Sequence, residues 1–228
     1  MKNALFNTGK LGNLDTNNKV VMAPMTRSRT AQPGDIPTEL MATYYGQRAS
    51  AGFIVSEATQ ISAQGKGYSF TPGIYTQAQI DGWKKVTNAV HDNDGIIFSQ
   101  LWHVGRMSHP VFHPDELPVA PSALAPDAQV WVVGDDGVGR MLDCPIPRAL
   151  SKQEIKGIVE DYRQAAVNAI EAGFDGVEVH AGNGYLIDQF LRATSNKRND
   201  EYGGSLENRI RFALEIVKAI SDEIGAER

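Results

Sequence analysis

Short apolar runs alternate with amphipathic stretches along most of the chain. Four of the runs are rich in β-branched residues and are bounded by turn-forming residues, a pattern typical of buried strands. They span residues 19–25, 53–58, 96–101 and 175–180. Because a helical pattern follows each run, the sequence predicts a parallel sheet built from β-α-β units.

Four amphipathic stretches predict the helices that follow these strands. The third has the clearest end signals, because Ser151 and Glu154 can form a capping box and Gly173 can end the helix. The approximate limits of the four helices are residues 38–50, 77–93, 151–173 and 205–225.

Two segments fall outside this alternation. Residues 103–150 separate the third strand from the third helix and are rich in proline and glycine. We expect an excursion here, with a hairpin from Val130 to Leu142 around a Gly-Asp-Asp-Gly turn. Residues 1–18 resemble a short preceding hairpin that could plug the floor of a barrel.

Composition argues against several classes of protein. With a net charge of −5 and no basic run, a nucleic-acid surface is not expected, and no apolar run is long enough to span a membrane. The single cysteine, Cys144, cannot form an internal disulfide, and the sequence has no zinc-binding spacing. A cytoplasmic location is the default expectation.

Polar and aromatic side chains gather at the carboxyl end of each of the four predicted strands. In an eight-stranded α/β barrel, the carboxyl ends of the strands carry the active site. Any one of these residues could simply cap a strand end, but their coincidence at all four strands favours a site. They are Thr26, Arg27, Glu57, Gln100, Trp102, His103, His180, Asn183 and Tyr185.

The stretch from His180 to Tyr185 carries the most chemical information. A turn containing glycine can bring the donors of His180 and Asn183 towards one point, where they would polarise a carbonyl oxygen. Tyr185, two residues later, could supply a proton to a neighbouring carbon. The alternative is a turn rich in glycine and asparagine with an incidental histidine.

Several long motifs resemble those of the old yellow enzyme family, and in particular its bacterial N-ethylmaleimide reductase-like ene-reductases. The resemblance covers essentially the whole chain and keeps the family order. It rests on the sequences at 23–27 (APMTR), 60–64 (QISAQ), 100–106 (QLWHVGR), 180–185 (HAGNGY) and 195–209 (SNKRNDEYGGSLENR).

The resemblance implies a TIM (β/α)8 barrel that binds FMN at its carboxyl face and is an NAD(P)H-dependent flavoprotein oxidoreductase. NADPH or NADH would reduce the flavin. The flavin would then pass hydride from N5 to the β-carbon of an alkene conjugated to a carbonyl or nitro group, while a proton reaches the α-carbon. The expected partner is this small-molecule substrate, with no nucleic acid or membrane.

Motif matching also implies which residues contact the cofactor. Thr26 would hydrogen-bond the flavin O4 and adjoin the substrate, and Gln100 would address the pyrimidine edge. Pro24, Met25 and Ala58 would line the isoalloxazine, as would His180. Thr26 stands where a subgroup of the family has cysteine, which places this chain outside that subgroup.

The remaining matched positions concern the substrate. His180 and Asn183 would hold its carbonyl oxygen, Tyr185 would be the proton donor, and Tyr68 and Trp102 would wall the pocket. Asn183 is histidine in many bacterial relatives. Both residues donate hydrogen bonds, so we expect a shift in substrate preference and retained activity.

Against the family pattern, residues 1–228 are expected to form the N-terminal half of the FMN-binding barrel. This half contains the first four β/α units, an N-terminal hairpin and the 103–150 excursion after the third strand. It would lack the phosphate site and a basic residue from the fifth strand. Its first and fourth strands would be open edges. The apolar side chains expected inside the barrel are Val20, Met22, Ile54, Val55, Ile97, Val177 and Val179.

Three hypotheses follow about the whole protein. In the first, the protein is an ene-reductase, wholly or as part of a split or truncated gene product. This half would then self-associate, be unstable alone or pair with a complementary half-barrel. It is instead a catalytically silent fragment that kept the motifs by descent. Or it is the barrel of a larger flavin and iron–sulfur relative such as a dienoyl-CoA reductase, which needs a cysteine cluster after the barrel.

Other noticeable residues have plainer interpretations. His103, His109 and His113 lie close in sequence but lack a carboxylate or cysteine partner, so we expect solvated loop side chains and no metal site. Cys144 is expected in a loop with no neighbour that lowers its pKa. The glycine pair at 203–204 lacks the spacing of a phosphate loop and predicts a turn.

Overall fold

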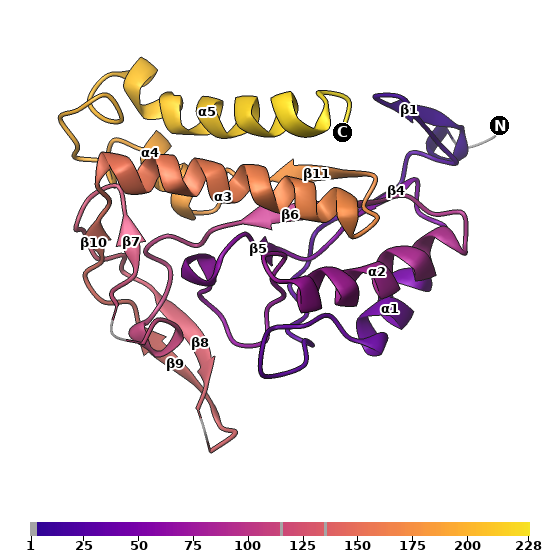
Figure 1. Cartoon of the computed structure of the whole chain (residues 1–228), viewed down its shortest axis with the longest axis horizontal. Coiled ribbons are helices and arrows are strands. Elements are labelled where there is room, and N and C mark those ends of the chain that lie inside the picture. Colours follow the sequence, from indigo (N-terminus) through magenta and orange to yellow (C-terminus); the bar gives the residue numbers. More distant parts are fainter. Residues whose placement is uncertain (1–3, 115, 135) are drawn as a thin grey trace.

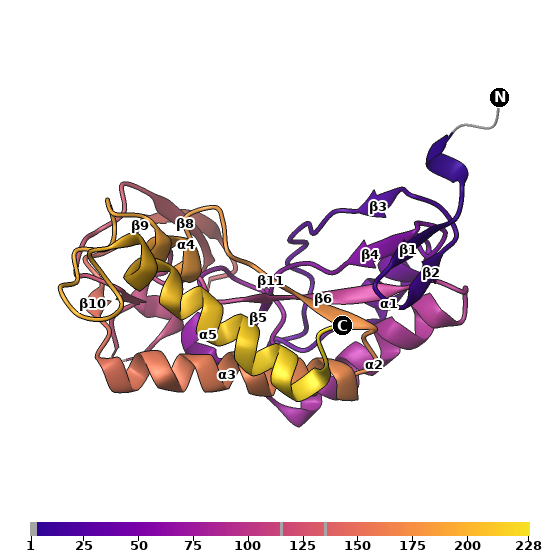
Figure 2. The ribbon, with the colours of Figure 1, turned by 90° about the horizontal axis from the view of Figure 1, so that it is seen from above.

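A central parallel sheet organises the fold in the computed structural model, which describes residues 4–114, 116–134 and 136–228. Its strands run in the order β11-β6-β4-β3, so that β11 and β3 form the two edges. Figure 1 shows β11, β6 and β4, and Figure 2 also shows β3. The bounds are β3 Val21–Met22, β4 Phe53–Val55, β6 Ile97–Trp102 and β11 Gly176–Val179.

All four predicted strands are present, and the first is shorter than predicted. It pairs with β4 only through Val21 and Met22. Pro24 follows two residues after Met22, and because proline has no backbone N–H it cannot continue a hydrogen-bonded ladder. The backbone from Pro24 onward is therefore free to form a loop at the carboxyl end of the sheet.

Helices pack along one face of this sheet (Figure 2). Capping boxes begin α2, where Thr76 and Gln79 exchange hydrogen bonds, and α3, where Ser151 and Glu154 do so as predicted. The four predicted helices are confirmed as α1 Glu39–Gly46, α2 Gln77–His91, α3 Lys152–Glu171 and α5 Leu206–Ile224.

The main core lies between the sheet and these helices. Ile54 and Ile97 are fully buried in it, together with Trp83 of α2 and Tyr162 of α3. Several strand residues were predicted to point into the barrel, and for five of them the prediction was wrong. Alternate residues of a strand face opposite sides of the sheet, and the side chains of these five residues face the helices. The corrected residues are Met22, Ile54, Ile97, Val177 and Val179.

The remaining strand side chains, which alternate with those in the core, lie on the opposite face of the sheet. Phe53 of β4 lies edge-on to Phe98 of β6, with ring centroids 5.7 Å apart. Further along the same face, Gln100 of β6 pairs with Glu178 of β11. Val20, also expected inside, precedes β3 and is exposed. This face therefore changes from apolar to polar towards the carboxyl ends of the strands.

The predicted N-terminal hairpin is confirmed for the described residues from Ala4 onward, while residues 1–3 lie outside them. It follows the short helix η1 (Ala4–Phe6) and pairs β1 (Gly9–Leu11) with β2 (Leu14–Thr16). A Cβ on Gly12 would lie 3.0 Å from the carbonyl oxygen of Glu227, which places the turn against the C-terminal residues. A role at a barrel floor stays a prediction.

The excursion contains the predicted hairpin and a second small sheet. Strands β8 (Gln129–Val133) and β9 (Gly139–Asp143) pair antiparallel, with Val130 opposite Leu142. Strands β7 (Val119–Ala120) and β10 (Arg148–Ala149) pair in parallel, after the short helix η3 (Pro110–Phe112). Residue 135, in the hairpin turn, lies outside the described residues.

The short elements η1, η3, β7 and β10 were not predicted, and neither were three others near the sheet. A two-residue strand, β5 (Thr59–Gln60), extends the pairing of β6, and η2 (Ala63–Gly65) follows it. Helix α4 (Leu186–Leu191) has only six residues and no side-chain cap, so local sequence gives little signal for it. Burial of five of these residues explains why it forms.

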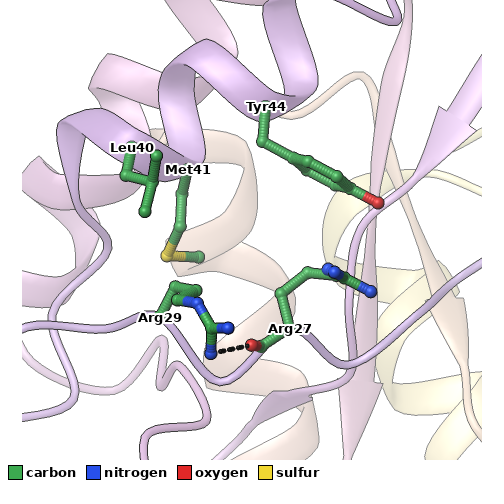
Figure 3. Close-up of a pocket in the computed structure, with 5 residues that line it drawn as sticks. All are labelled: Arg27, Arg29, Leu40, Met41 and Tyr44. Carbon is green, nitrogen blue, oxygen red and sulfur yellow. Dashed lines mark hydrogen bonds between the residues drawn. The ribbon is translucent and has the colours of Figure 1, made fainter.

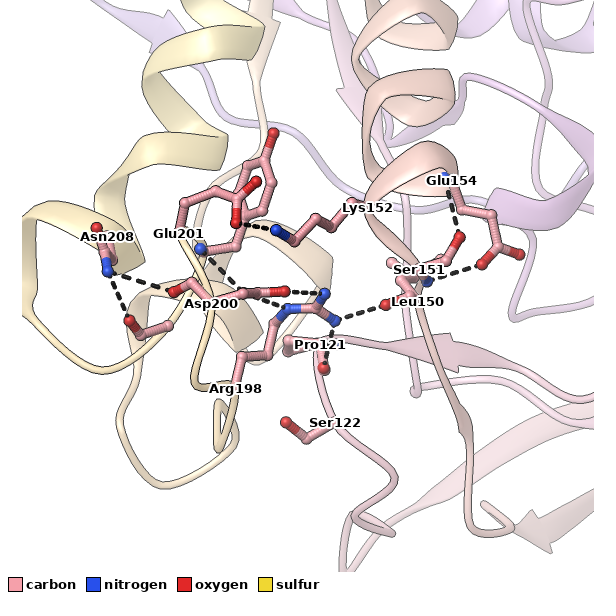
Figure 4. A network of polar contacts seen from close by, with 12 residues as sticks. Pro121, Ser122, Leu150, Ser151, Lys152, Glu154, Arg198, Asp200, Glu201 and Asn208 are labelled. Carbon is pink, nitrogen blue, oxygen red and sulfur yellow. Dashed lines mark hydrogen bonds and ion pairs between the residues drawn. The ribbon is translucent and has the colours of Figure 1, made fainter.

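The long 195–209 motif attaches the last helix to the excursion through Arg198 (Figure 4). Its guanidinium pairs with Asp200 at 2.6 Å and donates to the carbonyl oxygens of Pro121, at 3.0 Å, and Leu150, at 2.5 Å. The side chains of Arg198 and Asp200 are only 10% and 18% exposed. The predicted turn at Gly203 and Gly204 completes this structural segment.

Candidate active site

The carboxyl ends of the four strands meet at one edge of the sheet. Glu178 lies opposite Gln100 in the ladder, and the backbone N–H of His180 donates to Leu101. Val55 of β4 pairs with Phe98 of β6, and Thr59 of β5 pairs with Leu101. Residues 56–58 therefore lie opposite only residues 99–100, so the stretch from β4 to β5 has one residue more than β6. This extra residue is a bulge, a feature that redirects side chains next to many active sites.

Four of the predicted site residues form one continuous aromatic group. The ring of Tyr185 lies edge-on to His180 and to Trp102, with centroids 5.0 Å apart in both cases. Trp102 stacks on Tyr68 at 5.7 Å, and the hydroxyls of Tyr68 and Tyr185 lie 3.4 Å apart. Residues separated by more than a hundred positions are thus brought together as the sequence predicts.

The excursion supports this group from behind. Val130 and Val132 of the hairpin and the buried Cys144 form a small apolar cluster against which Tyr68 packs. The hydroxyl of Ser69 also accepts a hydrogen bond from Val133. Burial is the main reason that the pKa of the Tyr68 phenol is raised, and the contact with Tyr185 raises it further.

His180 is half-buried and neutral near pH 7. Burial lowers its pKa from the usual value of 6.5, although nearby carboxylates oppose the change. Its Nδ1 accepts the backbone N–H of Gly182 at 3.4 Å, so the proton resides on Nε2. Within the described residues Nε2 has no hydrogen-bond partner, which leaves it as a free donor.

Asn183 is exposed in a left-handed conformation, with φ of 58°. This conformation is uncommon for residues other than glycine, and asparagine tolerates it best. Its side-chain amide makes no hydrogen bond with any described residue. The turn therefore presents a second free donor close in sequence to His180.

Gln100 is buried, and its amide orientation is set by a neighbour that the sequence did not flag. Its Nε2 donates to Oε1 of Glu178 at 2.6 Å. With the nitrogen directed at the carboxylate, the amide oxygen is left to accept a hydrogen bond from outside the protein. Trp102 has a further unpaired group, since its buried Nε1 has no described partner.

The residues expected on the first two strands lie less tightly together. Ala58 is buried against Trp102 and joins the aromatic group. Pro24, Met25 and Thr26 lie on the loop after β3, where Met25 and Thr26 are exposed. This loop is tied to the second strand because the Arg27 N–H donates to the Glu57 carboxylate at 3.0 Å.

The histidine prediction needs a correction. His103 and His113 are buried, not solvated. His103 accepts a hydrogen bond from the backbone N–H of Gly105, and His113 contacts the Ser108 hydroxyl and the Lys66 carbonyl. Burial lowers the pKa of His103 to about 3, and His113 contributes to this decrease. Among the described residues no three His, Cys, Asp or Glu side chains gather as metal ligands would.

Sequence reasoning missed the roles of three partner residues, of which Glu57 and Tyr45 are buried and Glu178 is exposed. Glu178 orients Gln100, and Glu57 with Tyr45 supports the loop after β3. A glutamate inside an apolar strand run such as FIVSEA is a usable signal, since an ionisable side chain is seldom fully buried without a partner. The partner itself cannot be read from the sequence.

No helix in the described part of the chain is both long and apolar enough to cross a membrane.

The chain matches the NADH:flavin oxidoreductase / NADH oxidase family over residues 4–228. It is 48% identical to 12-oxophytodienoate reductase 7 of Oryza sativa subsp. japonica, over 98% of this chain and 56% of that protein.

Two solved structures show the same arrangement of elements. Morphinone reductase superposes with a TM-score of 0.95 at 55% identity, over 99% of this chain and 60% of that one. The old yellow enzyme homologue from Zymomonas mobilis gives 0.94 at 45% identity, over 99% and 62%. The chain thus spans about three fifths of the length of these relatives and has the fold of part of an α/β barrel. By this agreement of sequence and fold, it belongs to the NADH:flavin oxidoreductase family of old yellow enzymes.

Proposed function

We propose that this chain forms the flavin and substrate site of an FMN-dependent ene-reductase, which reduces alkenes conjugated to a carbonyl or nitro group. The observation that carries the proposal is the free Nε2–H of a neutral His180, on the same short turn as the free Asn183 amide and beside the ring of Tyr185. Family membership and the relatives named as reductases support it.

The described residues fit a flat, hydrogen-bonding cofactor such as FMN. Gln100 offers an amide oxygen, Thr26 an exposed hydroxyl and Ala58 a small apolar contact, all at the carboxyl edge of the sheet. Pro24 and Met25 would complete the side that β3 contributes. Once bound, the flavin supplies the hydride that NADPH or NADH has delivered to it.

The protein's own residues would orient and polarise the substrate. His180 and Asn183 donate to its carbonyl or nitro oxygen and draw electron density from the alkene, which makes the β-carbon electrophilic. Tyr185 donates its phenolic proton to the α-carbon and recovers one from solvent. Tyr68 and Trp102 exclude water from the side of the pocket where they stack.

We further propose that the rest of the barrel completes this site, from a longer protein or from a separate complementary chain. The free edges of β3 and β11 and the greater length of the relatives support this. It would supply the grip on the FMN phosphate. The contrasting hypothesis, a catalytically silent fragment, predicts that adding the complementary half restores nothing.

Flavin loading and turnover test the proposal directly. The purified chain, alone and with the complementary half of a relative, is incubated with FMN, desalted and recorded between 300 and 550 nm. We expect a flavin spectrum that NADPH bleaches and 2-cyclohexenone restores. If neither preparation retains flavin, or if bleached flavin is reoxidised only by oxygen, the proposal is overturned.

A further inference from the structure

A buried carboxylate lies under the loop that carries three of the proposed cofactor contacts. Glu57 is fully buried, and nothing in the proposed reaction uses it. The bulge at residues 56–58 releases it from the regular alternation of its strand. A fully buried carboxylate is costly unless its oxygens accept hydrogen bonds, so its partners explain its presence.

Those partners come from the first helix and from the loop after β3. The Tyr45 hydroxyl accepts from the backbone N–H of Glu57 at 2.8 Å and donates to its Oε1 at 3.3 Å. The other carboxylate oxygen accepts from the Arg27 N–H at 3.0 Å. Burial raises the pKa of Glu57, whereas the N–H groups of Arg27 and Ser28 and the Tyr45 hydroxyl oppose this by stabilising the charged form.

Arginine side chains also contact residues 24–28 of this loop, a segment that we call the turn from here on (Figure 3). Arg29 donates through Nη1 to the carbonyl oxygens of Arg27 and Ser28, both at 2.9 Å. The guanidinium of Arg27 lies over the ring of Tyr44, 5.3 Å from its centroid. Ser28 has a φ of 52°, a strained conformation that persists only where surrounding contacts enforce it.

We propose that Glu57, braced by Tyr45, is a positioning residue that fixes the Pro24–Ser28 turn in the shape that presents Thr26 to the flavin. Glu57 does not touch the cofactor and acts through the backbone of Arg27. The proposal rests on the function proposed above for what Thr26 contacts. It adds the component that holds this contact in place from the protein interior.

The test substitutes Glu57→Gln, which keeps the shape of the side chain and removes one acceptor. Tyr45→Phe is the second variant, since it loses only the hydroxyl that braces Glu57. The control is Thr87→Val, because the buried Thr87 hydroxyl donates to Ala172 at 2.7 Å in the helix layer, away from the loop. All three lose a buried hydrogen bond, and only the first two concern the turn.

The first readout is hydrogen exchange at the Arg27 amide in the flavin-free chain. We expect exchange to be at least about tenfold faster in Glu57→Gln, less accelerated in Tyr45→Phe and unchanged in Thr87→Val, because the first changes the carboxylate that accepts from Arg27, the second changes only the support of that carboxylate, and the third changes neither. Equal rates in Glu57→Gln and Thr87→Val would overturn the proposal. This result does not depend on flavin binding.

The second readout is the midpoint potential of bound FMN. Loss of a donor to flavin O4 disfavours the reduced form, so Glu57→Gln should lower the potential by about 30 mV, the value of a tenfold change for a two-electron couple. Thr26→Ala should lower it similarly, and the double variant should go no lower. Additive shifts, or an unchanged potential in Glu57→Gln, would overturn the proposal. A wild-type chain that takes up no FMN, either alone or with the complementary half, would instead overturn the proposed function, and the exchange rates would still decide the role of Glu57.

Discussion

Two parts of the molecule carry the longest family motifs, and they treat their polar groups in opposite ways. In the 195–209 segment, the guanidinium of Arg198 donates hydrogen bonds to Asp200 and to two backbone carbonyls. At the carboxyl edge of the sheet, Nε2 of His180 and the amide of Asn183 have no partner within the described residues. Polar groups that are paired inside the protein stabilise it, and groups left unpaired at one edge are available to a ligand.

A family motif can therefore have either of two roles: its polar groups stabilise the fold, or they remain available to a ligand. Arg198 joins the last helix to the excursion, and the excursion in turn packs against Tyr68 of the site. We therefore expect this segment to affect the proposed reaction only through the stability of the fold. Matched substitutions in the two regions test this distinction, because each should change one property and spare the other.

The largest expected effect comes from removing the hydroxyl of Tyr185. Tyr185→Phe should slow alkene reduction by about 10²–10⁴-fold, the usual contribution of a positioned proton donor. Reduction of FMN by NADPH should stay unchanged, since no proton reaches the substrate in that step. Stopped-flow measurement of the two half-reactions separates them.

The matching substitution in the other region is Tyr202→Phe. The Tyr202 hydroxyl donates to Glu215 at 2.9 Å, so its loss should cost about 1 kcal/mol of unfolding free energy and leave both half-reactions intact. A slowed half-reaction in Tyr202→Phe, or a wild-type rate in Tyr185→Phe, would remove the distinction between the regions.

The next effect concerns the two free donors. His180→Ala and Asn183→Gly should each lower kcat/KM for an enone by about 10²–10³-fold, as loss of one oxyanion donor does. Glycine is chosen at 183 because it adopts the left-handed conformation there without strain. Steady-state kinetics with thermal unfolding as a control measure this. Should both variants keep wild-type kcat/KM, the donors do not hold the substrate oxygen.

Arg198→Met tests the paired region by stability. It leaves Asp200 and two carbonyl groups without their donor, which should cost about 3 kcal/mol of unfolding free energy. Lys218→Met, in an exposed pair with Asp222, should change it by less than about 0.5 kcal/mol. Urea unfolding of the two variants gives the comparison. Equal losses of unfolding free energy in the two variants would mean that Arg198 contributes no more stability than an exposed ion pair does.

The fold could be predicted where local pattern decides it. Apolar runs, the capping box at Ser151 and the two strands of the excursion hairpin each depend on a few neighbouring residues, and each is found where the sequence indicates. The direction of strand side chains was wrong for Ile54 and Ile97, because periodicity says which residues share a face and not which face meets the helices. Helix α4 was missed because tertiary burial stabilises it.

The candidate site was predicted in part for the same reason. The carboxyl ends of parallel strands share one edge, so the grouping of His180, Trp102 and Tyr185 with Tyr68 follows from topology and the motif match. The supports of the site were not predictable. The contact between Tyr45 and Glu57 depends on a one-residue bulge, and the burial of His103 depends on packing that no local pattern records.

The smallest expected effect is a pH dependence confined to the paired region. The hydrogen bonds from Arg198 are the main cause that lowers the pKa of Asp200 below its usual value. A carboxyl whose pKa is lower in the folded state adds stability above its unfolded pKa of about 3.9, and this is lost as pH falls through the folded value. The stability gap between wild type and Arg198→Met should therefore narrow below about pH 4. Urea unfolding at several pH values checks this, and a gap that stays constant down to about pH 2.5 would show that Arg198 acts through its carbonyl contacts and not through the ion pair.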